Sequence, residues 1–450
     1  MKPNIIVFFS DQQRYDTVGV YGQKLDITPN LDYMASEGVT FENAFTCQPV
    51  CGPARSCMQT GKYATQTGCF VNDIGIKEDE ETIAKILSLN GYETAYVGKW
   101  HLASTQNECD YSKSAVPKEK RGGYEDYWMA SDVLEFTSHG YDGYVFNKDL
   151  EKVEFKGYRA DKITDFAIDF LENRNKNKPF LLFLSHIEPH HQNDRKTYEG
   201  PKGSKEKFKN YNLPFDLKDL DGDYKENYPD YLGCCNSLDD NLGKIRDKVK
   251  ELGIDENTII IYTSDHGCHF KTVNKELPEG GADDYKRSFY ENTIRVPLII
   301  YGPEFKGGKK IKELVSLIDI PKTILDICVN EIPDFMEGVS LLDLVNKQSK
   351  RDHIFIQISE SYVGRAIRTK KYKYCIIDYT KNPYKDKDSN EYTECYLYDL
   401  EKDPLEKNNL INIKEYENVK IELRTKIKKY IKHIENKDVD IKYNDIKIKK

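Results

Sequence analysis

Short apolar segments alternate with longer segments of helical spacing over the first two thirds of the chain, and together they predict an α/β fold. The apolar segments are nearly continuous rather than alternating, which is typical of strands buried on both faces of a mainly parallel sheet. We therefore expect a doubly wound sheet sandwiched by helices. The predicted strands are 5–9, 94–97, 180–184, 258–262 and 297–301, and the predicted helices are 81–89, 159–171 and 231–252.

The pattern changes near residue 345, where short strands follow one another through tight, charged turns. We expect an α/β domain at 1–347 and a smaller antiparallel α+β subdomain at 348–450. The subdomain's predicted elements are strands 354–358, 372–377 and 395–398 and an amphipathic helix 419–434. The polar stretch from Gln192 to Pro229 predicts a long surface insertion, and the lysine-rich end 440–450 predicts a solvated tail.

Composition narrows the classes of protein that fit this pattern. The 450 residues include 38% hydrophobic residues, enough for a core, and 67 Lys+Arg against 75 Asp+Glu give a net charge of −8. An acidic balance argues against nucleic acid as a partner. The odd number of cysteines, 11, excludes a complete set of internal disulfides. The apolar run before Asp11 is too short for a signal peptide or a membrane span, so we expect a soluble, cytoplasmic protein with no membrane partner.

Chemically capable side chains follow four of the predicted strands. They are Asp11 and Gln12, then Lys99 and His101, then His190, and finally Asp265 and His266. Because ligands bind outside the carboxyl ends of parallel strands, these residues should meet at one edge of the sheet. A single aspartate after a strand is often a helix cap, but four such strand ends together indicate a site. The alternative is a buried salt-bridge network with a structural role and no ligand.

Two chemistries are present in that set. Asp11, Gln12 and Asp265, with the imidazole of His266, suit a hard divalent cation such as Ca²⁺ or Mg²⁺. Lys, Arg and His donors beside a cation suit a tetrahedral oxyanion such as sulfate or phosphate. We therefore expect a metal-assisted site for an oxyanion.

The segment from Cys51 to Gly61, Cys-Gly-Pro-Ala-Arg-Ser-Cys-Met-Gln-Thr-Gly, completes this interpretation. Pro53 fits the first turn of a helix, so Cys51 would lie just before a helix N-terminus, which favours an anion. Arg55, one turn along, could turn back toward the same place. The segment predicts a nucleophile in an anion-binding pocket.

Cys-x-Pro-x-Arg followed by Thr-Gly resembles the signature of the formylglycine-dependent (type I) sulfatases of the alkaline phosphatase superfamily. Further similar motifs follow in family order: Thr28-Pro29-Asn30, Gly98-Lys99-Trp100-His101-Leu102, Pro189-His190, Ser264-Asp265-His266-Gly267, Lys286 ahead of Tyr290-Glu291, and Asp403-Pro404. The resemblance implies an alkaline-phosphatase-like fold. It also implies an enzyme that hydrolyses a sulfate monoester, with a carbohydrate O-sulfate as the expected substrate, to an alcohol and inorganic sulfate.

The resemblance also implies a role for each matching residue. In the family a separate maturase oxidises the signature cysteine, here Cys51, to formylglycine, whose hydrated aldehyde is the nucleophile. The implied Ca²⁺ ligands are Asp11, Gln12, Asp265, His266 and the modified Cys51. The implied catalytic residues are Arg55, which holds the formylglycine, Lys99 and Lys286, which bind sulfate, His101, a base, and His190, the acid that protonates the leaving alcohol.

The chain departs from the family pattern in two places. Many sulfatases have two adjacent aspartates where this chain has Asp11-Gln12, and Gln192 replaces the usual proline after Pro189-His190. The second departure leaves either His190 or His191 as the acid. Candidates for contacts to the alcohol half of the substrate are His186, His191, Gln192, Arg195, His269 and Arg287.

Other functions fit part of the same pattern. Phosphonate monoester and phosphodiester hydrolases share the nucleophile and an Asp-Gln start. A non-catalytic binder of sulfated glycans would keep Cys51 as a thiol. A Cys-His thiol hydrolase would not need the acidic residues, and Cys268 with His269 could instead bind zinc.

Overall fold

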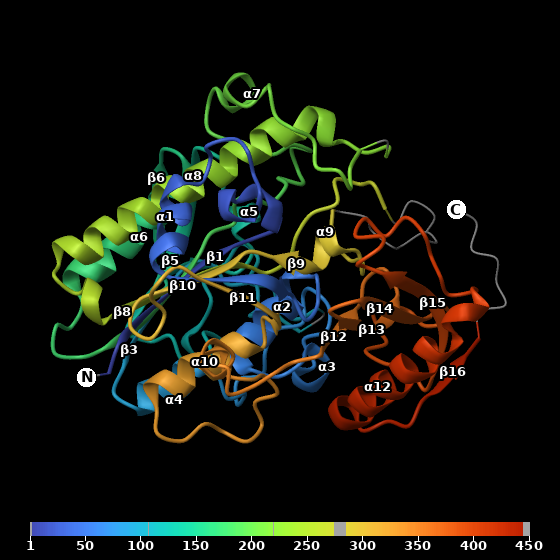
Figure 1. The fold of residues 1–450 in the computed structure, drawn as a ribbon. Coiled ribbons are helices and arrows are strands. Elements are labelled where there is room, and N and C mark those ends of the chain that lie inside the picture. The colour runs from blue at the N-terminus through green and yellow to red at the C-terminus, as the bar shows by residue number, and fades with distance from the viewer. Residues whose placement is uncertain (1, 107, 219, 274–284, 444–450) are drawn as a thin grey trace.

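A central β-sheet with helices on both faces forms most of the structure (Figure 1), a computed structural model that describes residues 2–106, 108–218, 220–273 and 285–443. The strand order is β11-β2-β10-β8-β1-β7-β3-β4-β5-β6, with β9 paired to β2. The strands are β1 (Asn4–Ser10), β2 (Val39–Phe45), β3 (Glu93–Lys99), β4 (Tyr127–Ser131), β5 (Asp142–Asn147), β6 (Lys152–Lys156), β7 (Phe180–Ser185), β8 (Thr258–Ser264), β9 (Arg295–Val296), β10 (Leu298–Tyr301) and β11 (Lys309–Ser316).

Helices cover the two faces of this sheet. In Figure 1, α1, α6 and α8 lie on one face, and α2, α4 and α10 lie on the other. The helices are α1 (Pro29–Glu37), α2 (Cys51–Thr60), α3 (Ala64–Thr67), α4 (Ile83–Leu89), α5 (Leu134–Thr137), α6 (Arg159–Asn173), α7 (Ser204–Lys207), α8 (Tyr224–Glu251), α9 (Glu291–Ile294), α10 (Asp319–Cys328), α11 (Leu341–Val345) and α12 (Glu417–Glu435). Within the described ranges, no helix is long and apolar enough to cross a membrane.

Strand β1 shows why its sequence is continuously apolar. It lies in the middle of the sheet, parallel to both β7 and β8. Ile6 and Phe8 pack in one hydrophobic cluster with residues of α6 and α8, whereas Ile5 and Val7 pack in another with residues of α4 and α10. Because both faces of the strand are buried, the five residues between Asn4 and Ser10 are all apolar. The predicted α/β sandwich is confirmed.

The sheet is more mixed than the apolar pattern indicates. The predicted strand 297–301 corresponds to β10, which runs antiparallel to both of its neighbours, β8 and β2. Burial on two faces makes a strand apolar but does not fix its direction. Strand β2 was not predicted, because its sequence Val-Thr-Phe-Glu-Asn-Ala-Phe interrupts the apolar run with Glu and Asn.

The segment from Gln192 to Pro229 is only partly the surface insertion that its polarity predicts. Helix α8 begins at Tyr224, so the end of the segment is helical. Tyr198, Phe208 and Leu217 are buried in a cluster with aromatic residues of α8. Lysines such as Lys196, Lys202 and Lys205 are exposed, whereas these widely spaced apolar side chains anchor the segment.

A second, five-stranded sheet carries the C-terminal part of the chain, with the order β12-β13-β14-β15-β16. Its strands are β12 (His353–Ile358), β13 (Val363–Thr369), β14 (Tyr372–Asp378), β15 (Glu391–Asp399) and β16 (Asp440–Lys442). Strands β12 to β15 are antiparallel, as predicted, with α12 packed against β13 and β14. Strand β16 corrects the predicted tail, since 440–442 pair in parallel with β15, and 444–450 lie outside the described residues. The boundary at residue 347 stays a prediction.

Buried ion pairs join this second sheet to the main one. Glu291 of α9 lies 3.1 Å from Arg368 of β13 and 3.4 Å from Lys373 of β14, and Lys373 also contacts Glu406. Burial alone would raise the pKa of Glu291, but Arg368 and Lys373 outweigh it and lower the pKa to about 2. The buried carboxylate of Glu291 therefore stays ionised because Arg368 and Lys373 of the second sheet lie beside it.

Replacing Arg368 by alanine should destabilise the protein by about 3–5 kcal/mol, because it leaves the buried Glu291 carboxylate with one partner fewer. The matched control is Lys370→Ala, which removes an exposed pair with Glu313 at 3.4 Å and should cost less than about 1 kcal/mol. Urea unfolding of both variants measures the difference. Equal losses in the two variants would contradict a buried electrostatic link between the sheets.

Candidate active site

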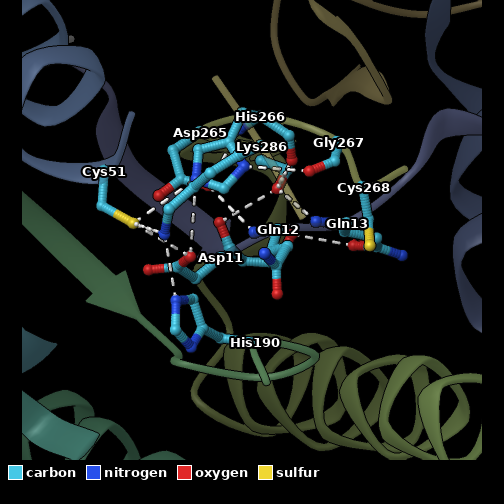
Figure 2. Close-up of polar contacts among 12 residues, drawn as sticks. Asp11, Gln12, Gln13, Cys51, His190, Asp265, His266, Gly267, Cys268 and Lys286 are labelled. Carbon is cyan, nitrogen blue, oxygen red and sulfur yellow. Dashed lines mark hydrogen bonds and ion pairs between the residues drawn. The ribbon is translucent and has the colours of Figure 1, made fainter. Parts of the chain in front are cut away.

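The carboxyl ends of four strands meet at one place, together with the first residue of α2. Figure 2 shows Asp11, Asp265 and His190, which follow three of these strands, grouped near Cys51 and Lys286. Ser10 pairs with Ser264 in the register of β1 and β8, so Asp11 and Asp265, the next residues, emerge side by side. Lys99 ends β3, and His190 lies in the loop after β7. Parallel pairing therefore collects side chains that are far apart in sequence.

Cys51 begins α2 and is buried against three charged groups. Its Sγ accepts a hydrogen bond from Lys286 Nζ at 2.9 Å and lies 3.4 Å from His266 Nε2 and 3.5 Å from Asp11 Oδ1. Burial would raise the pKa of the Cys51 thiol, but Lys286, Lys99 and His266 outweigh it and hold the pKa well below its usual value. The position stabilises a negative charge at residue 51.

Asp11, Cys51, Asp265 and His266 form the one group of three or more His, Cys, Asp or Glu in the described ranges that could hold a metal ion. One ligand atom from each lies within 4.8 Å of the others, and all four residues are buried. Burial and the neighbouring Asp11 raise the pKa of Asp265 to about 6. Two facing, buried carboxylates suit a hard divalent cation, so the residues present fit Ca²⁺.

Arg55 lies one turn along α2 from Cys51 and reaches the same carboxylates. Its Nη2 is 2.9 Å from Asp11 Oδ2 and 3.5 Å from Asp265 Oδ2. Lys99 Nζ donates to the same oxygen of Asp11 at 2.8 Å. Burial would raise the pKa of Asp11, but Lys99, His190 and Arg55 lower it below its ordinary value. The carboxylate therefore stays ionised between two cations.

Gln12 links the end of β1 to the loop after β7. Its backbone N–H donates to Asp265 Oδ1 at 3.0 Å, and its side-chain Oε1 accepts from the backbone N–H of His191 at 3.0 Å. The residue has a φ of 68°, in the left-handed region. An amide oxygen is a ligand type that hard cations such as Ca²⁺ take, so the Gln12 side chain has suitable chemistry for the same cation.

His190 and His191 point to different partners. His190 Nε2 lies 3.1 Å from Lys286 Nζ, and its Nδ1 lies 2.6 Å from the carbonyl oxygen of His191. The ring of His191 packs on Tyr198 and Tyr285 instead, with its Nδ1 2.9 Å from Asn193 Oδ1. Of the two candidates for the acid, His190 is the one in contact with the Lys286 ammonium.

His101 follows β3 in a loop that a buried carboxylate holds in place. Its backbone N–H donates to the carbonyl of Asp132 at 2.7 Å, and its φ is 59°. The Asp132 side chain accepts from the backbone N–H groups of three consecutive residues, 102, 103 and 104, each at 2.9 Å. The His101 side chain hydrogen-bonds Cys51 and lowers its pKa. The loop thus fixes an imidazole beside residue 51.

Three of the candidate substrate-contact residues, His269, Arg287 and Gln192, make hydrogen bonds with residues around the site. His269 Nε2 lies 2.9 Å from the backbone oxygen of Lys286. Arg287 Nε donates to Glu360 Oε2 at 2.6 Å. Gln192 accepts from Arg159 Nη1 at 3.2 Å and donates to the backbone oxygen of Glu135 at 3.0 Å. These contacts position the loops that carry Lys286 and His190.

Two further candidates lie away from the cluster. His186 is buried against Phe8, 3.3 Å from Thr164 Oγ1, and burial lowers its pKa to about 3, so it is a neutral core residue. Arg195 is half-exposed and pairs with Glu199 at 2.7 Å.

Cys268 contacts the Tyr198 hydroxyl at 3.3 Å and is not part of the metal-capable group in the described ranges.

Sequence reasoning missed two carboxylates at the site. Glu135, from the short helix α5, lies 3.9 Å from Lys99 Nζ and 3.4 Å from His190 Nδ1. Glu360, in the loop between β12 and β13, accepts from the backbone N–H of Asn72, whose Oδ1 accepts from Gly52 N at 2.9 Å. Glu135 follows no predicted strand, and Glu360 follows the predicted strand 354–358 of the antiparallel subdomain, where strand ends are not expected to form a ligand site.

Comparison with protein families identifies the class of protein that this fold and site define. The sulfatase family model matches residues 3–329, and the model of the N-sulphoglucosamine sulphohydrolase C-terminal region matches residues 281–433. The chain therefore belongs to the sulfatase family, sulfuric ester hydrolases of the alkaline phosphatase superfamily.

Individual relatives extend over nearly the whole chain. An ulvan-active sulfatase of Formosa agariphila is 31% identical over 95% of this chain and 81% of its own length. An N-acetylglucosamine-6-O-sulfatase of Bacteroides thetaiotaomicron is 28% identical, with 98% and 88% covered. The solved structure of BT4656 with its substrate D-glucosamine-2-N,6-O-disulfate has 26% identity and a TM-score of 0.75, and all of both chains is covered.

Proposed function

We propose that this sulfatase hydrolyses an O-sulfate ester of a carbohydrate through a formylglycine that a maturase makes from Cys51. The carbohydrate class is supported by relatives that are named for N-acetylglucosamine 6-sulfate and ulvan and by the disulfated glucosamine bound to BT4656. The observation that carries the chemistry is the placement of Cys51, which is buried between Lys286 and the carboxylates of a metal-capable group.

The proposed Ca²⁺ ligands are Asp11, Asp265, His266, residue 51 and the side-chain oxygen of Gln12. Here the Cys51 sulfur stands where an oxygen of formylglycine would lie. When bound, the cation and the hydrated aldehyde together supply a strong oxygen nucleophile at neutral pH. Arg55 holds the two carboxylates from one side, which keeps their oxygens facing residue 51.

The chain's own cations bind the sulfate group and offset the charge that develops as the ester breaks. Lys99 and Lys286 are both buried, contact Asp11 and Cys51 respectively, and donate only. We propose that both bind sulfate oxygens. Removing one preorganised donor of this kind typically lowers the rate by about 10²–10³.

Two imidazoles move protons in the proposed reaction. His190, in contact with Lys286, protonates the alcohol oxygen as its bond to sulfur breaks. His101, held beside residue 51 by Asp132, would act as the base that accepts the proton that residue 51 gives up as sulfate leaves. His190 contacts Lys286, whereas His101 contacts residue 51. We therefore assign His190 to the cleavage of the ester and His101 to the release of sulfate.

The function is tested with protein that has been produced together with a formylglycine-generating maturase. N-acetylglucosamine 6-sulfate should be converted to N-acetylglucosamine and inorganic sulfate, which ion chromatography measures. A phosphodiester of the same alcohol should react at least about 10²-fold more slowly. A phosphodiester that reacts orders of magnitude faster would make the protein a phosphodiesterase instead.

Protein produced without the maturase serves as the control. Intact-peptide mass spectrometry across Cys51 should show a thiol in the control and an aldehyde in the active sample. A thiol at Cys51 in both samples, with binding of sulfated sugars but no turnover, would favour a non-catalytic glycan binder.

A further inference from the structure

A carboxylate in a pocket for sulfate requires an explanation, because it repels the substrate. Glu135 lies in α5, between β4 and β5, and its side chain is only 10% exposed. Its Oε2 faces His190 Nδ1 at 3.4 Å and Lys99 Nζ at 3.9 Å. Burial would raise the pKa of Glu135, but protonated His190, Lys99 and Lys286 outweigh it and lower the pKa, so the carboxylate is ionised beside an imidazolium.

Glu135 is held in this position by the same loop that carries His190. Asn193 Nδ2 donates to Glu135 Oε1 at 3.2 Å, and Gln192 Nε2 donates to the Glu135 backbone oxygen at 3.0 Å. Gln192 is in turn fixed by the buried Arg159. The carboxylate and the imidazole are therefore positioned against each other through both the side chain and the backbone of α5.

The contacts of His190 fix where its proton lies. Lys286 Nζ can only donate, so His190 Nε2, at 3.1 Å, must be the acceptor. Nδ1 therefore carries the hydrogen and donates to the carbonyl of His191 at 2.6 Å, with Glu135 Oε2 on the same side. In this state Nε2 has no proton to give to an alcohol.

A second proton on Nε2 creates an imidazolium beside Lys286, in a pocket that also contains Lys99. Like charges at this distance disfavour that state. Glu135 is the carboxylate in contact with the opposite ring nitrogen, and a charge-assisted contact there favours the imidazolium and fixes the ring.

We propose that Glu135 is the positioning residue for His190, and that its carboxylate stabilises the imidazolium that donates the Nε2 proton to the leaving alcohol. The inference rests on the proposed role of His190 as the acid. As the bond between sulfur and the ester oxygen breaks, its electron pair passes to the oxygen. The oxygen takes the proton from Nε2, and neutral His190 remains with its hydrogen on Nδ1. Sugar alcohols are poor leaving groups, so this proton transfer matters most for them.

The test is a double-mutant cycle of Glu135→Gln and His190→Ala, with N-acetylglucosamine 6-sulfate as the substrate. Glu135→Gln keeps the shape of the side chain and should lower kcat by roughly 10–10² with KM changed less than about threefold. His190→Ala should lower kcat further, and adding Glu135→Gln to it should then cost less than about threefold. Glu135→Asp should restore part of the lost kcat. Glu154→Gln, an exposed glutamate on β6, is the matched control and should leave kcat unchanged.

The outcomes separate the inference from the proposed function. Losses that multiply in the double variant, or a Glu135→Gln effect on KM alone, would overturn the role of Glu135 while leaving His190 as the acid. Full activity of His190→Ala would instead overturn the assignment of the acid, and the inference with it. Thermal unfolding of each variant, compared with Glu154→Gln, shows whether a lost rate comes from lost folding. A Glu135→Gln variant that fails to fold is replaced by Asn193→Ala, which frees the same carboxylate and should give a smaller loss of the same kind.

Discussion

Cys51→Ala should lower turnover of the sulfated sugar by about 10⁴-fold or more, without a comparable loss of stability. Loss of the proposed nucleophile would remove the covalent route altogether, as in other enzymes that depend on one nucleophile. The variant also removes the sulfur that faces Lys286 and His266, but it leaves both carboxylates in place. Steady-state kinetics with sulfate release and a thermal melt measure the two effects.

Cys109→Ala provides the control for this substitution. Cys109 is a free, partly exposed cysteine whose Sγ donates to the backbone oxygen of Ala103 at 3.6 Å, and its loss should leave turnover within about twofold. If Cys51→Ala kept more than a few per cent of the activity, the nucleophile would have to be another residue. Mass spectrometry of the parent protein should show the aldehyde at Cys51 and at no other cysteine.

Asp265→Ala should have the second-largest effect, with kcat lowered by at least about 10²-fold and less than one Ca²⁺ retained per chain. Asp265 is one of two fully buried carboxylates in the metal-capable group, and its loss would remove a charge from the proposed Ca²⁺ site. It also takes away one partner of Arg55. Elemental analysis of the dialysed variant, together with kinetics at saturating Ca²⁺, measures both losses.

Asp239→Asn is the matched control, since Asp239 is also a buried carboxylate but lies away from the site. It accepts from the backbone N–H groups of Asn30 and Leu31 at 3.0 and 2.7 Å, so the substitution should lower the melting temperature and leave the metal content unchanged. Retention of a full equivalent of Ca²⁺ by Asp265→Ala would mean that the cation is held elsewhere.

Burying the charged residues of the proposed site lowers the free energy of unfolding unless neighbouring residues provide partners for them. Arg55, Asp11 and Lys99 are buried together, and burying charges is unfavourable unless each has partners. Carboxylates outside the motifs, such as Asp132 and Glu135, hold the backbone or the cations around this centre. Substitutions in these supporting residues should therefore affect rate as well as stability.

The sequence by itself determined the central strands and the residues that follow them. Strands β1, β3, β7 and β8 are buried on both faces, so their apolar runs are continuous, and the residue after each strand is at the sheet edge by geometry alone. The Cys51 segment was equally clear, because Pro53 and Gly61 mark the start and end of α2. Strand direction was not determined, as β10 shows, because burial does not depend on it.

Only the tertiary structure decided which charges face one another. The pairing of Ser10 with Ser264 sets Asp11 beside Asp265, and the loop after β7 turns His190 rather than His191 toward Lys286. Glu135 comes from a four-residue helix whose sequence has no periodic signal, so its place opposite His190 appears only when β4 and β7 are packed in one sheet. The physical reason is that a motif is defined by spacing along the sequence. The energy of an electrostatic contact depends instead on the distance between the two charges in space, whatever their separation in sequence.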